Sequence, residues 1–125
     1  MDALGQVFEA VSNYFALLSE PTRLRILHSI CRDEKSVSQI VAETGATQTN
    51  VSRHLSTLYR AGALSRRKDG NFTYYGVRDS ALVEICRTVC THIAARDDER
   101  FEERSGMRQL ADEWPARLEA SEEFR

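Results

Sequence analysis

This chain of 125 residues has few of the features that mark secreted or membrane proteins. Its three cysteines are too few, and odd in number, for a disulfide framework. No apolar run approaches about 20 residues, so no membrane span is expected. The first residues, Met-Asp-Ala, do not form a basic segment followed by an apolar one. We therefore expect no signal peptide and a cytoplasmic protein.

Catalytic motifs are also scarce. The sequence contains no Cys-x-x-Cys pair, no glycine-rich phosphate loop and no paired carboxylates on a pocket-forming pattern. We therefore expect that the protein is not an enzyme. A thiol enzyme is the alternative that its cysteines would allow. The length suits one domain, and no repeat, Gly/Ser linker or low-complexity tract divides it.

Charge is unevenly distributed along the chain, although the net charge is only −2. Residues 47–78 carry six lysines and arginines against a single acid, whereas residues 97–125 carry ten acids and five arginines. A clustered basic segment is the electrostatic footprint of nucleic-acid binding. We therefore predict a DNA-binding and dimerisation domain over residues 1–96 and an acidic, helical C-terminal extension over residues 97–125.

Apolar residues recur at helical spacing in five segments, which begin near residues 4, 21, 36, 47 and 80. Ser36 and Thr47 are expected to cap two of these helices, and Gly45 to end the first of the two. After Gly62 the period changes, and Asp-Gly at residues 69–70 lies between two β-prone runs, which predicts a hairpin. The predicted fold class is mostly α with a small β-hairpin wing, that is, a homodimeric winged helix-turn-helix.

The helix over residues 47–61 is the predicted reading helix. If its apolar residues point inward, the polar side chains of its first turns point outward. A recognition helix meets base edges with its N-terminal turns, and Gln and Arg can form bidentate base contacts. The predicted base-reading residues are therefore Gln48, Thr49, Ser52 and Arg53.

Three stretches of the chain resemble the arsenic-repressor/metallothionein-repressor (ArsR/SmtB) family. They are SEPTRLRILHSI, SVSQIVAETGATQTNVSRHLSTLYRAGAL and RRKDGNFTYYGV. The resemblance runs from about Phe8 to about Ile93. It implies a homodimer with the first and last core helices at its interface, repression by binding operator DNA, and release by an inducer. It places DNA contacts at Gln48, Thr49, Ser52, Arg53 and His54, with Arg67 and Lys68 on the wing.

Both metal sites known in that family lack ligands here. The stretch at residues 34–38, where the family's thiolate site begins, has no cysteine. The positions that match the family's intersubunit site are Asp79, Ala81, His92 and Ala95, and only two of these four can bind a metal. Because zinc prefers four ligands, we expect no standard zinc site and interpret Asp79 as a helix cap.

The cysteines Cys31, Cys86 and Cys90 are the remaining candidates for an inducer or redox site. Cys86 and Cys90 are one helical turn apart, so with His92 they could hold a soft metal ion or arsenite. Cys86 and Cys90 could instead be oxidised. Some members of the family sense sulfide or oxidants with one cysteine in the second helix and one in the last, and the resemblance places Cys31 and Cys90 in those two helices, where persulfidation could occur. All three could also be small apolar core residues. The predicted function is a repressor released by a thiol-reactive species or a soft metal or metalloid, with Cys90 as the preferred sensor. The rival is a winged-helix protein that binds proteins without specific DNA binding.

Overall fold

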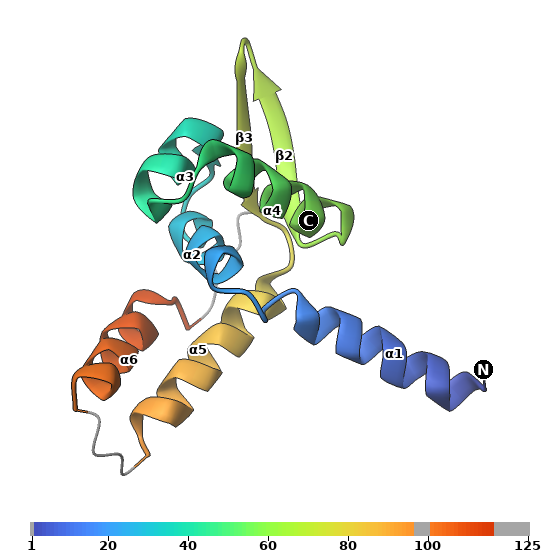
Figure 1. The fold of residues 1–125 in the computed structure, drawn as a ribbon, viewed down its shortest axis with the longest axis vertical. Coiled ribbons are helices and arrows are strands. Elements are labelled where there is room, and N and C mark those ends of the chain that lie inside the picture. Colours follow the sequence, from blue (N-terminus) through green and yellow to red (C-terminus); the bar gives the residue numbers. More distant parts are fainter. Residues whose placement is uncertain (1, 97–100, 117–125) are drawn as a thin grey trace.

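The computed structural model describes residues 2–96 and 101–116. Figure 1 shows a hairpin that rises from a body of helices, and one helix that extends away from this body. The predicted winged helix-turn-helix is confirmed. The elements in chain order are α1 (Ala3–Ala16), α2 (Pro21–Ile30), β1 (Lys35–Ser36), α3 (Val37–Thr44), α4 (Gln48–Arg60), β2 (Leu64–Asp69), β3 (Phe72–Val77), α5 (Ser80–Ala94) and α6 (Phe101–Glu113).

The helix ends are set by local side-chain chemistry. The Ser36 side chain accepts from the Gln39 backbone N–H, and the Gln39 side chain accepts from the Ser36 backbone N–H at 2.8 Å, which is a capping box. The Thr47 side chain caps α4 by accepting from the Asn50 backbone N–H. Between these helices Gly45 has a φ of 71°, a left-handed conformation that glycine adopts without steric cost. The predicted caps and the predicted glycine turn are therefore confirmed.

The wing is a three-stranded antiparallel sheet in the order β1-β3-β2. β2 and β3 pair along their full length, from Leu64 opposite Val77 to Asp69 opposite Phe72, around a turn at Gly70. The predicted hairpin is confirmed, but the sequence did not predict β1. This strand has only two residues, which is too short to show an alternating pattern.

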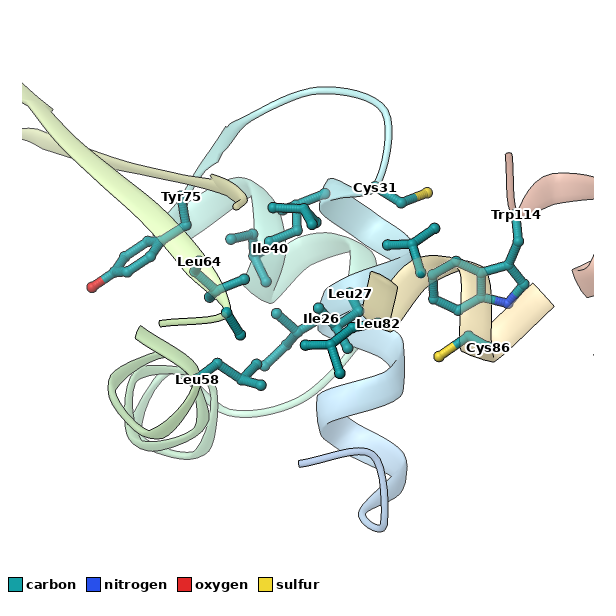
Figure 2. Close-up of a cluster of buried hydrophobic side chains, with 14 of the residues drawn as sticks. Ile26, Leu27, Cys31, Ile40, Leu58, Leu64, Tyr75, Leu82, Cys86 and Trp114 are labelled. Atoms are coloured by element: carbon teal, nitrogen blue, oxygen red, sulfur yellow. The ribbon is translucent and has the colours of Figure 1, made fainter. Parts of the chain in front are cut away.

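The core lies where α2, α3, α4, the base of the sheet and α5 meet (Figure 2). Its centre consists of aliphatic side chains that are almost fully removed from solvent. Two of them, Ile26 and Leu27, come from α2, and others come from α3, α4 and α5. Figure 2 shows Tyr75 of the wing and Trp114 on opposite sides of this cluster. The core therefore fixes the reading helix and the wing relative to each other.

The helix α6 packs along α5 (Figure 1). A buried tryptophan, Trp114, directly follows its last residue. Trp114 is 1% exposed and meets the ring of His28 edge to face, with centroids 5.4 Å apart. Arg87 of α5 donates to the carbonyls of Ala111 and Trp114 at 2.6 and 2.7 Å. Part of the predicted acidic extension thus completes the core. The boundary at residue 96 stays a prediction, and residues 97–100 and 117–125 lie outside the described residues.

The helix α1 contributes almost nothing to the core of its own chain. None of its residues, Ala3–Ala16, is buried, and its apolar stripe faces solvent. Phe8 is 65% exposed and Leu4 is 61% exposed. Among the helices that the structure describes, none has both the length and the apolar character needed to cross a membrane.

Candidate nucleic-acid interface

The reading helix α4 is amphipathic, with its inner face held by the core. Val51, Leu55 and Leu58 are at most 1% exposed. The outer face of its first turns is solvent-exposed, and all four side chains predicted from the helical pattern lie on it. These are Gln48, Thr49, Ser52 and Arg53.

Arg53 is partly oriented by its neighbours on the same helix. Its guanidinium donates to the Asn50 side-chain oxygen at 3.2 Å and lies 3.4 Å from His54 Nε2. Asn50 is also exposed, although it was not among the residues predicted to read bases. Since asparagine can pair with adenine edges, Asn50 belongs with this surface. The sequence could have indicated Asn50, because it lies three residues before Arg53 and therefore on the same face of the helix.

His54 is not on the surface. Its side chain is buried, and its Nε2 lies 3.3 Å from Glu20 Oε2 at the start of α2. Burial lowers the pKa of His54, while the Glu20 carboxylate opposes that shift. Its burial leaves little of the ring for the DNA contact that the resemblance implied, and that contact stays a prediction. In the structure, His54 ties the reading helix to α2.

The wing cations are in three different environments. Arg66 lies over the Tyr59 ring at 4.1 Å from its centroid. Arg67 lies over Tyr74 at 4.5 Å, and its guanidinium is paired with Glu34. Lys68, nearer the tip, is exposed. The charge of Arg67 is thus partly neutralised within the chain, whereas Lys68 extends from the strand into solvent.

Asp79 has a structural role. Its side chain accepts from the Ala81 backbone N–H at 3.1 Å and caps α5. It also accepts from the Tyr14 hydroxyl at 2.7 Å, which joins α1 to α5. Burial and this carboxylate raise the pKa of Tyr14 to about 12. The interpretation of Asp79 as a helix cap is confirmed.

All three cysteines are free and buried. Burial raises the pKa of Cys86 to about 11 and also raises the pKa values of Cys31 and Cys90. For Cys90 the neighbouring Trp114 indole opposes this effect. Buried, protonated thiols are poor nucleophiles and poor metal ligands.

The expected metal ligands do not come together. His92 is exposed, whereas Cys86 and Cys90 are buried. Within residues 2–96 and 101–116, no three His, Cys, Asp or Glu side chains form a group that could hold a metal ion. The candidate set of Cys86, Cys90 and His92 is therefore not assembled in this chain.

Cys86 and Cys90 instead line an apolar pocket of about 320 Å³. Its walls come from the end of α1, from α2, from α5 and from the end of α6. They include Phe15, Leu24 and Trp114. The sequence did not predict this pocket, because it forms only where α1 and α2 meet α5 and α6, which lie at the other end of the sequence.

Known proteins are similar to this chain in both amino-acid sequence and fold. A model of bacterial regulatory proteins of the arsR family matches residues 20–65. A probable mercury resistance operon repressor of Streptomyces lividans is 35% identical over 77 residues, which is 62% of each chain. The chain thus spans less than two thirds of that repressor. An HTH-type transcriptional regulator of Methanocaldococcus jannaschii is 31% identical over 83 residues, which is 66% of this chain and 93% of that one.

The fold is also found among solved structures. The homodimeric winged helix-turn-helix DNA-binding domain of Mb0332 from Mycobacterium bovis superposes with a TM-score of 0.63 at 24% identity. The match covers 80% of this chain and 96% of that domain. With the reading helix and wing described above, these findings establish that the chain is not an enzyme but a winged helix-turn-helix transcriptional regulator of the arsR family of bacterial regulatory proteins.

Proposed function

We propose that this regulator is a repressor that binds operator DNA as a homodimer and is released by a small inducer. The observation that carries the proposal is the exposed polar face at the start of α4. Gln48, Thr49, Ser52 and Arg53 lie together there, on a helix whose opposite face is fixed in the core. In the winged helix-turn-helix arrangement this face enters the major groove. Because operator DNA lies in the bacterial cytoplasm, we place the proposed function there.

The wing supplies the non-specific part of this binding. Lys68 and Arg67 lie on the hairpin beyond the reading helix, where cations can meet phosphates. Because Arg67 is paired with Glu34, we assign the larger phosphate contact to Lys68.

Dimerisation is supported by the exposed apolar stripe of α1. Its members are 47% to 65% exposed in the single chain, which is an unusually large apolar surface for a small soluble domain. Val89 of α5 is also 47% exposed. The Mycobacterium bovis domain with this fold is described as homodimeric. A two-fold dimer would present two reading helices to a palindromic site, about one turn of DNA apart.

The proposed inducer site is the cysteine-bearing face of α5. Cys86 and Cys90 line a pocket that also contacts the end of α1, so a change there reaches both proposed dimer helices. A thiol-reactive species is a better fit than a soft metal, because no group of three metal-ligating side chains is assembled among the described residues. Cys90 is the preferred target, since the Trp114 indole partly opposes the rise of its thiol pKa.

The experiment is selection of bound duplexes from a random DNA pool, followed by affinity measurement on the selected site and on a scrambled one. We expect a palindromic site bound by two chains, with affinity that falls steeply as salt rises. A chain that binds no duplex at low salt would contradict the proposal and favour a protein-binding winged helix. Equal affinity for selected and scrambled DNA would contradict the reading role of α4.

A further inference from the structure

The ring of His54 lies between the start of α2 and the exposed face of the reading helix α4, two helices that pack together (Figure 1). Its side chain is only 5% exposed, so its polar contacts are mainly with the chain itself. The ring nitrogen Nε2 lies 3.3 Å from the Glu20 carboxylate oxygen Oε2 and 3.4 Å from a guanidinium nitrogen of Arg53. The buried ring therefore contacts the side chain that we propose reads bases.

These two contacts of Nε2 exclude each other as hydrogen bonds. A ring nitrogen carries either a proton or a lone pair. With a proton, Nε2 donates to the Glu20 carboxylate and cannot accept from Arg53. With a lone pair, Nε2 accepts from Arg53 and faces the carboxylate with no proton between them. The position of one proton thus decides whether the ring holds the guanidinium.

The surroundings of the ring favour the proton on Nε2. Although loss of solvent opposes the change, the backbone N–H groups of Arg23 and Thr22 lower the pKa of Glu20, so its carboxylate is ionised at neutral pH. Turning a lone pair toward this half-buried carboxylate would leave two acceptors facing each other, which is unfavourable. The Arg53 guanidinium, in contrast, is exposed and also donates to the Asn50 side chain at 3.2 Å. It therefore loses little when the ring does not accept from it.

We propose that Glu20 and His54 are positioning residues for Arg53, in which the carboxylate keeps the ring proton on Nε2 and the guanidinium stays free to turn toward a base. The inference rests on the proposed function, because it requires Arg53 to read bases. Without the carboxylate, the proton moves to Nδ1 and Nε2 accepts from Arg53. The guanidinium must then leave the ring before it can reach DNA, and operator binding becomes weaker.

The variant Glu20→Ser separates this role from the role of Glu20 as a helix cap. Glu20 is the N-cap of α2, and its side chain accepts from the Arg23 backbone N–H at 2.9 Å. Serine is a favoured N-cap residue, but its side chain is too short to reach the ring. Asp33→Ser is the matched control, because it removes one negative charge from an exposed position between α2 and β1.

The first measurement is the tautomer of His54 in the full chain without DNA, by long-range ¹H–¹⁵N NMR of histidine-labelled protein at about pH 7.5. Burial lowers the pKa of His54, so its ring is neutral at this pH. The chain has three histidines, and the spectrum of His54→Leu identifies the signal that belongs to His54. We expect the Nε2–H form in the parent and in Asp33→Ser, and the Nδ1–H form in Glu20→Ser. The Nδ1–H form in the parent, or one tautomer in all three chains, would overturn the proposal.

The second measurement is the ratio of the affinities for the selected operator and a scrambled duplex. We expect Glu20→Ser to lower this ratio about fivefold, the cost of breaking one hydrogen bond, and Asp33→Ser to leave it unchanged. In an Arg53→Ala chain, Glu20→Ser should cause no further fall, and a further fall would overturn the proposal. If Glu20→Ser alone leaves the ratio unchanged, only this inference fails. If Arg53→Ala leaves it unchanged, the base-reading role in the proposed function fails, and the inference fails with it.

A third variant, His54→Leu, keeps the proposal open to refutation even if Glu20→Ser does not fold. It removes the ring acceptor, so the guanidinium cannot be held there. The affinity ratio should therefore stay within about twofold of the parent, with or without Glu20→Ser. A larger fall in His54→Leu would overturn the proposal and would assign a direct DNA contact to His54.

Discussion

Replacing Trp114 by alanine tests whether the end of α6 belongs to the core. The side chain is 1% exposed, and truncating a buried aromatic to alanine costs about 3 to 5 kcal/mol of unfolding free energy. We therefore expect a loss of about 3 to 5 kcal/mol for Trp114→Ala. Trp114→Phe, which keeps a ring and removes the indole N–H, should cost about 1 kcal/mol or less.

Urea unfolding followed by far-ultraviolet circular dichroism measures these losses, since the variants lack the only fluorescent indole. The matched control is Phe72→Ala, an aromatic residue of the wing that is 57% exposed, which should change stability by less than about 0.5 kcal/mol. If Trp114→Ala lost no more than Phe72→Ala, α6 would be an appended segment. The assignment of Trp114 to the core would then be wrong.

Three further outcomes follow from the described contacts. His54 is buried with a lowered pKa, so below its ordinary value of 6.5 the unfolded chain takes up a proton that the folded chain resists. The free energy of unfolding of the parent should therefore fall as the pH is lowered from about 7 to about 5, and that of His54→Gln should fall less. Parallel plots of unfolding free energy against pH for the two proteins would contradict this. On the wing, Lys68→Ala should lower the slope of log affinity against log salt by about one, and Arg67→Ala should lower it less, because Arg67 is paired with Glu34. Equal changes would show that this pair does not persist on DNA. Finally, with a thiol pKa of about 11, only about one Cys86 side chain in a thousand is ionised at pH 8. Alkylation of Cys86, followed by mass spectrometry, should therefore be far slower in the native chain than in urea. Rapid native alkylation would contradict its burial.

Much of the winged helix-turn-helix could be predicted because its signals are local. The capping box of Ser36 and Gln39 and the turn at Gly70 each depend on residues a few positions apart. The exposed face of α4 followed from helical periodicity alone.

The features that the sequence did not reveal depend on contacts between distant residues. His54 flanks the apolar stripe of α4, and only its partner Glu20, from another helix, shows that it turns inward. The burial of Trp114 depends on α5 and on His28, so the low apolar content of α6 gave no sign of it. The pocket beside Cys86 likewise requires four helices to be placed together.

The base-reading role of α4 is tested most directly by measuring Arg53→Ala on the selected operator and on a scrambled duplex of equal length at one salt concentration. Arg53 lies in the first turns of the helix, where base contacts are expected, whereas Arg60 carries the same charge in its last turn. We predict that Arg53→Ala weakens operator binding by about 1 to 3 kcal/mol, roughly 5- to 150-fold, with little change on scrambled DNA. Arg60→Ala should change both affinities alike. An Arg53→Ala variant that loses the same affinity for both duplexes, or for neither, would contradict the proposal that this face of α4 reads bases.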